Sequence, residues 1–471
     1  MSLVQFFCLL IHAYLNMELE LKEMLLREEA REIPIFYEAD ICVLGGSCTG
    51  VFAAVRAARL GARVVIIEKQ NAFGGVATSG LVNIWHSLQN TEFDQQIIAG
   101  LTLETIERLD RVGGVIEERK NHSAGYMLNT EELKIELDRL IQESNVKAYL
   151  HTMFVSPHVV NGELQAAIVE NKSGRGAIKA KLFIDATGDG DLCDRLGVAQ
   201  RLSPHFQPST ACAKISGWEQ GTEGIDLPYL LLKHKDEFGI PEGFGWGTQV
   251  PGSTDVHMYA GTRVYHANSA DGEALTYSEM EGRRQVRAIM DLVHTYGRGD
   301  RMSLVSLPSY IGTRETRHIA CHYQLTGEDV LYGRRFDDAI ANGSYRIDIH
   351  HQDKPGLTFK YLDGEQAYIR PGYPKEIGRW REMTEHNPTF YQIPYRSLLP
   401  EGPYRNVIVA GRMLDIDEEA FGGVRVMVNM NQLGEAAGVA AYIALTEEKG
   451  FANVDVQSLR HQLQSGGSIV L

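Results

Sequence analysis

Short runs of apolar residues alternate with helical patterns along much of the chain, and two of these runs lead into glycine-rich turns. Residues 39–44 (ADICVL) and 181–185 (KLFID) are mostly apolar and rich in β-branched side chains, which is typical of strands buried on both faces. Residues 405–413 (RNVIVAGRM) repeat the pattern. Strands that alternate with helices predict an α/β fold with a parallel sheet.

The first of these strands continues into a motif that predicts nucleotide binding. A glycine-rich turn (GGSCTG, 45–50) is followed by an alanine-rich helix and by a second strand, RVVII, which ends at Glu68. This order is the βαβ dinucleotide fingerprint, in which Gly45 permits the tight turn, Gly50 lets the helix approach the strand, and Glu68 accepts hydrogen bonds from a ribose. Ser47 replaces the middle glycine, and its hydroxyl could donate to a phosphate. A glycine-rich turn in an unrelated α/β protein is the alternative.

Three further segments favour FAD over a nicotinamide cofactor. The loop FGGVATSG (73–80) indicates backbone that passes close to a planar ligand. Residues 146–184 predict a β-meander with turns at Asn161-Gly162 and at 173–176. Residues 422–445 predict a long helix whose small residues allow tight packing against a sheet. The amino-terminal end of that helix, near 424–427, would support negative charge on a reduced flavin.

Composition narrows the classes of function. The 471 residues carry 46 basic and 61 acidic side chains, which gives a net charge of −15. Such a charge repels the phosphates of nucleic acids, and the sequence has no local basic patch that would overcome this repulsion. Six cysteines occur without a CxxC motif or histidine-rich ligand spacing. We therefore expect neither a disulfide framework nor a metal site, and a cytoplasmic location.

The first residues predict a helical extension, assigned to 1–37. Residues 3–15 form an apolar run shorter than the roughly 20 residues of a membrane span. Residues 17–32 follow with an acidic amphipathic pattern. The alternatives are a signal peptide or membrane anchor, and a start of translation at Met17.

In their order along the chain, GGSCTG, GGVATSG, IDATGDGD and VAGR followed by the small-residue helix resemble the FAD-dependent oxidoreductases of the glutathione-reductase-like class. The chain looks close to the succinate dehydrogenase/fumarate reductase flavoprotein branch. It is most similar to a group with no settled substrate, which shares the stretches 312–331, 333–350 and 393–400. The resemblance covers roughly residues 38–447. It has no counterpart of the HPT-containing segment of fumarate reductase, so it does not support fumarate as the substrate.

The resemblance implies a set of cofactor contacts. The glycine turn at 45–50 would hold the pyrophosphate, and Glu68 and Lys69 would contact the adenosine. The loop that follows would pass near the flavin and the ribityl chain. Val155, a strand residue, would meet the adenine through its backbone. The last strand and helix would contact the ribityl phosphate and the flavin O2. Arg412 stands where many relatives have an acid, which puts the usual ribityl hydroxyl contact in doubt. The implied cofactor residues are Gly45, Gly46, Ser47, Cys48, Thr49, Gly50, Glu68, Lys69, Gly74, Gly75, Val76, Thr78, Val155, Ala186, Thr187, Gly188, Gly411, Arg412, Arg425 and Val426.

The expected architecture is a glutathione-reductase-type, Rossmann-like FAD-binding domain with a β-meander and an inserted α+β substrate domain. We assign the FAD-binding domain to 38–205 and 391–447, and the substrate domain to 206–390. Residues 448–471 are assigned as a C-terminal tail.

Charged and aromatic side chains in and around the substrate domain are candidates for chemistry. Arg314 and Arg317, if helical, would share a face and could clamp a carboxylate, or they could form ion pairs with Glu315 at a domain boundary. His350, in the DIHH stretch, could act as acid or base beside flavin N5. Three further candidates are Tyr395 and Arg396, placed at the domain junction, and His86, which could instead be a core histidine or a point of flavin attachment.

These residues together predict an enzyme. We expect an FAD-dependent oxidoreductase that transfers a hydride between flavin N5 and a small, carboxylated substrate held by Arg314, Arg317 or Arg396. A homo-oligomer is a further expectation. The alternatives are a flavoprotein subunit that passes electrons to a redox partner, and a non-redox nucleotide-binding protein.

Overall fold

The computed structural model describes residues 26, 28–118 and 125–471. The chain divides into two units, Met1–Pro34 and Ile35–Leu471, and the fold below is that of the second unit. Most of the expected helical extension lies outside the described residues, and its described part is not helical: residues 28–34 have no regular structure, and residues 35–37 belong to a strand, because they pair with the edge of a sheet. In the described part of the chain, no helix is long and apolar enough to cross a membrane.

A five-stranded parallel sheet lies at the centre of the second unit, in the order β24-β11-β2-β3-β7. The expected strands are confirmed: β2 and β3 are buried at every residue, because helices and sheet cover both faces. Helix α2 (Cys48–Arg59) connects them. The five strands are β2 Ile41–Leu44, β3 Val64–Ile67, β7 Lys147–Tyr149, β11 Leu182–Asp185 and β24 Val407–Val409.

The expected helix at 422–445 is in fact two helices. The chain forms α10 (Glu418–Val424), breaks at Arg425 and Val426, and continues as α11 (Met427–Thr446). Val426 has extended backbone, φ −64° and ψ 145°, which ends the first helix and caps the second. The chain therefore turns at the position where the amino-terminal end of a helix was predicted.

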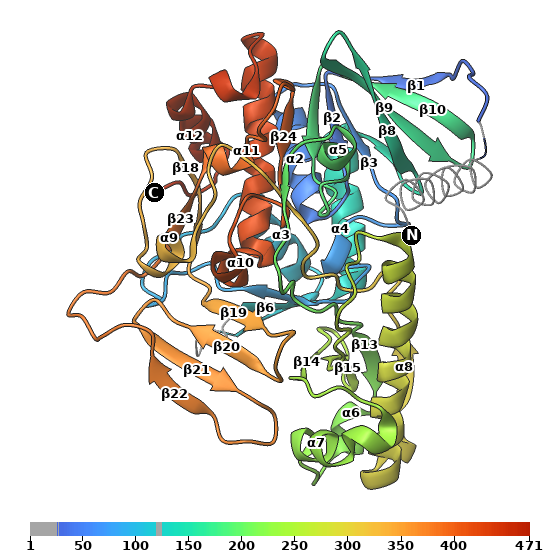
Figure 1. Ribbon diagram of the computed structural model, residues 1–471, viewed down its shortest axis with the longest axis vertical. Coiled ribbons are helices and arrows are strands. Elements are labelled where there is room, and N and C mark those ends of the chain that lie inside the picture. Colours follow the sequence, from blue (N-terminus) through green and yellow to red (C-terminus); the bar gives the residue numbers. More distant parts are fainter. Residues whose placement is uncertain (1–25, 27, 119–124) are drawn as a thin grey trace, which may run out of the picture. The chain divides into compact units, whose positions relative to one another are not determined.

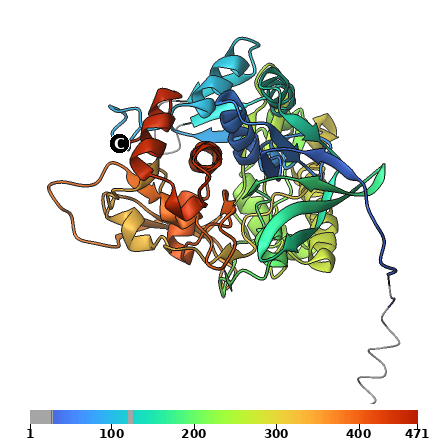
Figure 2. The same cartoon turned by 90° about the horizontal axis from the view of Figure 1, so that it is seen from above.

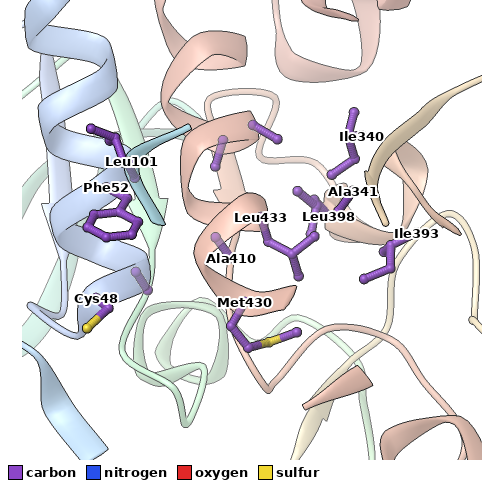
Figure 3. Close-up of a cluster of buried hydrophobic side chains, with 14 of the residues drawn as sticks. Cys48, Phe52, Leu101, Ile340, Ala341, Ile393, Leu398, Ala410, Met430 and Leu433 are labelled. Carbon is purple, nitrogen blue, oxygen red and sulfur yellow. The ribbon is translucent and has the colours of Figure 1, made fainter. Parts of the chain in front are cut away.

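Helix α11 packs most extensively on α2, not on the sheet as predicted. A Cβ at Gly434 would lie 2.1 Å from the carbonyl oxygen of Thr49, and one at Gly438 would lie 2.3 Å from that of Ala53. The two contacts are four residues apart on each helix and follow one another in the same order, so the helices run parallel. Figure 2 shows α11 nearly end-on, with α2 and α12 beside it. In Figure 3, Cys48 and Met430 mark the first turns of α2 and α11 at the same end of the cluster.

The expected meander exists, but two of its predicted parts belong elsewhere. Strands β8 (Met153–Val160), β9 (Glu163–Asn171) and β10 (Gly174–Lys179) pair antiparallel, and β1 (Ile35–Glu38) joins at the edge. Asn161 and Gly162 have φ of 53° and 80°, as a tight hairpin requires. Residues 147–149 and 182–185 pair instead within the parallel sheet. Their buried, apolar character suits both sheets, so the local pattern did not distinguish them.

Two antiparallel sheets form within residues 206–390 and lie in the lower part of Figure 1. The first has the order β14-β15-β13-β16 and packs against α8; the second has the order β19-β20-β21-β22. Contacts join all of Ile35–Leu471 into one compact unit, so the domain boundaries at 205/206 and 390/391 remain predictions. The elements are β13 Ala213–Ser216, α6 Trp218–Thr222, α7 Leu227–Phe238, β14 Trp246–Gln249, β15 Val256–Ala260, α8 Gly272–Tyr296, β16 Ser303–Ser306, β19 Ile347–His350, β20 Leu357–Lys360, β21 Glu365–Ile369 and β22 Glu376–Arg379.

Smaller elements connect these layers. Strand β18 pairs with β23 beside α11, and α12, near the C-terminus, packs on α11. The remaining elements are β4 Ile84–His86, α3 Leu101–Asp110, β5 Val115–Glu118, β6 Gly125–Leu128, α4 Thr130–Glu143, α5 Asp191–Arg195, β12 Gln200–Arg201, β17 His318–Ile319, α9 Gly327–Leu331, β18 Ala339–Gly343, β23 Tyr391–Pro394 and α12 Val456–Ser465, with 3₁₀ turns at Gly75–Ala77, Gly299–Arg301, Tyr395–Leu398 and Phe451–Asn453.

A buried ion pair fastens the two parallel helices. Arg56 of α2 bonds to Glu435 of α11, and their side chains are 6% and 1% exposed. Glu435 also accepts hydrogen bonds from the backbone N–H of Leu101 and the hydroxyl of Ser468, both at 3.0 Å. The pair thus joins α2, α3, α11 and the C-terminal segment.

Candidate functional site

The turn after β2 is accessible to solvent, although the strand that leads into it is fully buried. Gly45 and Ser47 are partly exposed, whereas their neighbours are buried. Gly45 has φ 97°, and a Cβ there would lie 2.3 Å from the carbonyl oxygen of Ala186. A Cβ at Gly50 would lie 1.9 Å from the carbonyl oxygen of Gly45. Both glycines are therefore required by the fold, as the fingerprint predicts.

Glu68 lies at this turn. Its Oε2 accepts from the N–H of Gly46 at 2.6 Å, and its Oε1 accepts from the N–H of Gln70 at 2.7 Å. Burial raises the pKa of the carboxyl. Beside it, the Lys69 Nζ lies 3.4 Å from the hydroxyl oxygen of Tyr310. The acid is thus held against the glycine turn, where a ribose would lie.

The glycine-rich loop folds back onto the same turn. The N–H of Gly74 donates to the carbonyl oxygen of Gly46 at 2.8 Å, and a Cβ at Gly75 would lie 2.9 Å from that of Ser47. Gly75 and Val76 are partly exposed. Thr78 is buried, and its hydroxyl donates to the carbonyl of Phe73 at 2.6 Å, so it stabilises the loop.

The carboxyl ends of β11 and β24 complete one side of the site. Thr187 and Gly188 follow β11 and are partly exposed, and a Cβ at Gly188 would lie 2.6 Å from Arg412 Nη1. Arg412, just after Gly411, forms an ion pair with Asp189, while its Nε has no partner among the described residues. Ala186 is buried and Val155 of β8 is partly exposed.

The residues present fit FAD. The amino-terminal ends of α2 and α11 lie at the same end of two parallel helices, and such ends favour anionic groups. Around them are the glycine cradle, an acid for the ribose, and Arg412 and Arg425, each with an unpartnered Nε among the described residues. Cys48 is buried, with its Sγ 3.6 Å from the carbonyl oxygen of Gly74, and Thr49 lies under Gly434.

Next to the glycine-rich loop, two arginines lie together without a carboxylate. The bridge between Thr210 and Gly312 brings this segment beside Val76, since a Cβ at Gly312 would lie 3.7 Å from Val76 Cγ2. Arg314 donates from Nη1 to the carbonyl of Pro208 and the hydroxyl of Thr210, and Arg263 bonds to the same hydroxyl at 3.2 Å.

Neither guanidinium forms an ion pair with a carboxylate in the described part of the chain. Burial and the charges of Arg263 and Arg425 hold the pKa of Arg314 well below its usual range. Arg263 is 2% exposed, and Arg314 is partly exposed. A buried positive charge without an ion-pair partner is costly, and the nearby charge of Asp348 offsets that cost only in part, so the pair favours an anionic ligand.

Asp348 binds Arg425, just before the start of α11, and its charge also acts on Arg263 and Arg314. Its Oδ2 accepts from Arg425 Nη2 at 3.1 Å and from the hydroxyl of Tyr345 at 3.2 Å. Although burial opposes its charge, His350, Arg425 and Arg346 hold the pKa of Asp348 well below its usual range. His350 Nε2 lies 3.2 Å from Asp348 Oδ1, yet burial lowers the pKa of His350 to about 3. The imidazole is therefore neutral at pH 7.

The structure separates the other candidates from this cluster. Residues 313–317 are not helical, so Arg314 and Arg317 do not share a face, and Arg317 lies 2.8 Å from Asp194. Glu315 pairs with His318 at 3.0 Å and not with the arginines. The expected clamp of Arg314 with Arg317 is wrong because the spacing i, i+3 brings side chains together only in a helix.

Tyr395 and Arg396 contact a different set of residues. The Tyr395 hydroxyl donates to the carbonyl of Phe451 at 2.9 Å inside the core. Arg396 lies 3.3 Å from Asp338 and over the ring of Tyr323. The structure therefore gives both residues partners away from Asp348, and it supports neither as a substrate contact.

His86 lies at the edge of the cluster. Its ring stacks on Tyr345 with centroids 4.0 Å apart, and its Nδ1 has no partner among the described residues. Burial lowers its pKa to about 3.

Sequence reasoning missed three members of the cluster: Arg263, Tyr345 and Asp348. Arg263 follows a strand in an unremarkable stretch, GTRV, and only the tertiary fold brings it beside Arg314. Asp348 is the first residue of the DIHH stretch, in which only His350 was predicted to act as an acid or base. Its alternation with His350 along a strand was the available signal, because such residues share a face.

Comparisons with known proteins agree with the cofactor site. A family model described as FAD dependent oxidoreductase matches residues 40–463. No curated protein matches the sequence. Similar solved structures include a geranylgeranyl bacteriochlorophyll reductase-like protein from Thermoplasma acidophilum, at 11% identity and TM-score 0.47 over 91% of this chain and 83% of that one. The flavin-dependent brominase Bmp2 has 11% identity and TM-score 0.44, over 91% and 84%. At these scores the structural likenesses carry no argument about function.

Proposed function

We propose that this chain, which belongs to the family of FAD-dependent oxidoreductases, transfers a hydride between flavin N5 and a small, carboxylated organic substrate. The observation that carries the substrate class is the pair Arg263 and Arg314, which has no carboxylate partner among the described residues. A substrate carboxylate would supply that partner.

Arg314 is the residue best placed to bind the carboxylate. Its Nη1 is occupied by Pro208 and Thr210, which fixes the plane of the guanidinium. Its Nη2 and Nε make no hydrogen bond to the described residues and can form a bidentate contact. Arg263, whose guanidinium is bonded to the carbonyl oxygens of Thr262 and Phe244, adds a second positive charge close to Arg314.

Substrate binding would also prepare His350 to accept a proton. Burial is the largest cause of its low pKa, and the charges of Arg314 and Arg263 lower it further, while Asp348 raises it. A carboxylate bound at Arg314 would offset the arginine charges and so raise the basicity of the imidazole. The bound flavin supplies the hydride acceptor or donor, and this chain's residues orient the substrate and hold the proton.

The finer architecture also belongs to this proposal. The two antiparallel sheets within 206–390 support an inserted substrate domain on a glutathione-reductase-type FAD-binding domain. The break between α10 and α11 supports placement of the flavin O2 at Arg425 and Val426. A position near the succinate dehydrogenase branch remains a prediction from the sequence motifs.

A spectral titration tests the substrate class. Acetate and oxalate, added to the oxidised holoprotein, should perturb the flavin absorption bands saturably, whereas acetamide should not. Equal effects of acetate and acetamide would contradict an anion site beside the flavin.

A further inference from the structure

A cavity opens beside the stacked rings of His86 and Tyr345, both of which line it. It has a volume of about 190 Å³ and includes Val428 and Asn429 from the first turn of α11. That helix begins where the flavin is expected, and Val428 of the cavity lies two positions after Val426, a proposed flavin contact.

Several of the side chains that line the cavity end in planar groups. The rings of His86 and Tyr345 are stacked at an interplanar angle of 29°. The Arg346 guanidinium lies 5.1 Å from the centroid of Tyr345 and 5.8 Å from that of Tyr361, and all four residues line the space. Stacked rings and a planar guanidinium favour a flat ligand.

The charges of the cavity disfavour an anion. The rim carries the exposed carboxylates of Glu92 and Asp363 against the single guanidinium of Arg346. Burial keeps His86 neutral at pH 7, with a pKa of about 3. This cavity therefore differs from the arginine pair and suits a different, uncharged ligand.

Phe93 stands at the rim in a costly conformation. It has φ 59°, in the left-handed region that bulky residues avoid, and its side chain is 39% exposed. The side chain of Asn90 holds the turn, donating to Asp94 Oδ1 at 2.7 Å and accepting from the N–H of Asp94 at 3.3 Å. The fold thus fixes an exposed ring at the mouth of the cavity.

We propose that this cavity binds a planar, uncharged ring compound with carbonyl oxygens, the chemistry of a quinone, as the electron acceptor of the enzyme. The ring stacks between the His86–Tyr345 wall and Phe93, and a carbonyl oxygen accepts from Arg346. The acceptor takes up two electrons and two protons from the reduced cofactor and leaves as the hydroquinone, and the cofactor returns to its oxidised form. The redox role rests on the proposed function, whereas binding of the ring does not.

Menadione is a suitable probe. Holoprotein reduced anaerobically with one equivalent of dithionite should be reoxidised by menadione at a rate that saturates with menadione concentration. Phe93→Ala should raise the half-saturating concentration at least fivefold, and Thr91→Trp, which fills the cavity, should remove saturation. Tyr277→Ala, which removes another exposed aromatic side chain outside the cavity, is the control and should change nothing.

A binding measurement keeps the two proposals apart. Saturation-transfer NMR with the oxidised holoprotein should show menadione contacts that Thr91→Trp removes and Tyr277→Ala retains. Reoxidation and contacts that are unaffected by both cavity variants would overturn the acceptor site. Because neither measurement uses a carboxylic acid, failure of the proposed substrate class would leave these results unchanged.

Discussion

Gly434 of α11 lies directly against Thr49 of α2, so close that a Cβ at Gly434 would be 2.1 Å from the Thr49 carbonyl oxygen. This contact sets two helices parallel and brings their amino-terminal ends together at the proposed phosphate and flavin positions. The small-residue pattern of the last long helix therefore has a functional consequence: it aligns the two ends of the cofactor site.

Gly434→Val should separate the two helices. The added side chain meets backbone that cannot move away cheaply, so the free energy of unfolding should fall by about 2 kcal/mol or more, and FAD affinity should fall with it. Gly272→Ala is the control, because no atom lies within 4 Å of a Cβ at that position. Urea denaturation and FAD titration measure both effects, and a Gly434→Val protein with unchanged stability would contradict the packing.

Removal of one partner from the buried ion pair should cost more than removal of both. Glu435→Gln leaves the Arg56 guanidinium buried without a carboxylate and should destabilise the fold by about 3 kcal/mol. The double variant Arg56→Met, Glu435→Leu should lose less. The same cycle on the pair Arg59 and Glu104, whose side chains are 34% and 30% exposed, should give a loss in the free energy of unfolding of under about 1 kcal/mol. Equal losses in the two cycles would show that burial does not decide the effect.

Glu68→Gln should weaken FAD binding selectively. The amide replaces a carboxylate that accepts backbone N–H groups at the glycine turn, and loss of a charged acceptor for the ribose should raise the Kd by about tenfold. The exposed Glu107→Gln is the control. Flavin fluorescence during titration of the apoprotein measures the Kd, and identical values for both variants would remove Glu68 from the site.

Stability should fall as the pH falls below about 6.5. Burial lowers the pKa of His86 and of His350 to about 3, from an ordinary value of 6.5. Between these values the unfolded chain binds protons that the folded chain does not, which costs up to about 1.4 kcal/mol per pH unit for each histidine. Denaturation at pH 7, 6 and 5 gives the slope of the free energy of unfolding against pH. This slope should be smaller for the double variant His86→Gln, His350→Gln than for the wild type. An unchanged slope would contradict the burial of neutral imidazoles.

Local patterns predicted the elements that bind the cofactor, because the glycine turn, α2 and the acid after β3 are set by neighbouring residues. The same patterns failed where pairing depends on distant partners. Residues 147–149 suit either sheet, and only β3 decides their position. The break at Arg425 and Val426 falls in a stretch rich in glycine and valine (GGVRVMV, 422–428), which has low helix propensity. That low propensity alone does not fix where one helix ends and the next begins.

The substrate side depends more strongly on the tertiary fold. The charged stretch at 314–318 suggested a helix and a clamp, but the extended chain directs Arg314 to Thr210 and Arg317 to Asp194. Arg314 shares the Thr210 hydroxyl with Arg263, 51 positions earlier, and two like charges brought together in this way have no signature in a single sequence.

The most direct test of the account is anaerobic reduction of the bound flavin. Small carboxylic acids with an oxidisable carbon, offered in turn to the holoprotein, should include at least one that bleaches the flavin band, while the matching amides do not. Arg314→Met should raise the Kd of that acid or slow reduction by more than tenfold, and Arg396→Met, whose partner is Asp338, should leave both within twofold. Bleaching that is equally fast with Arg314→Met, or with the amides, would contradict a carboxylated substrate held at Arg314.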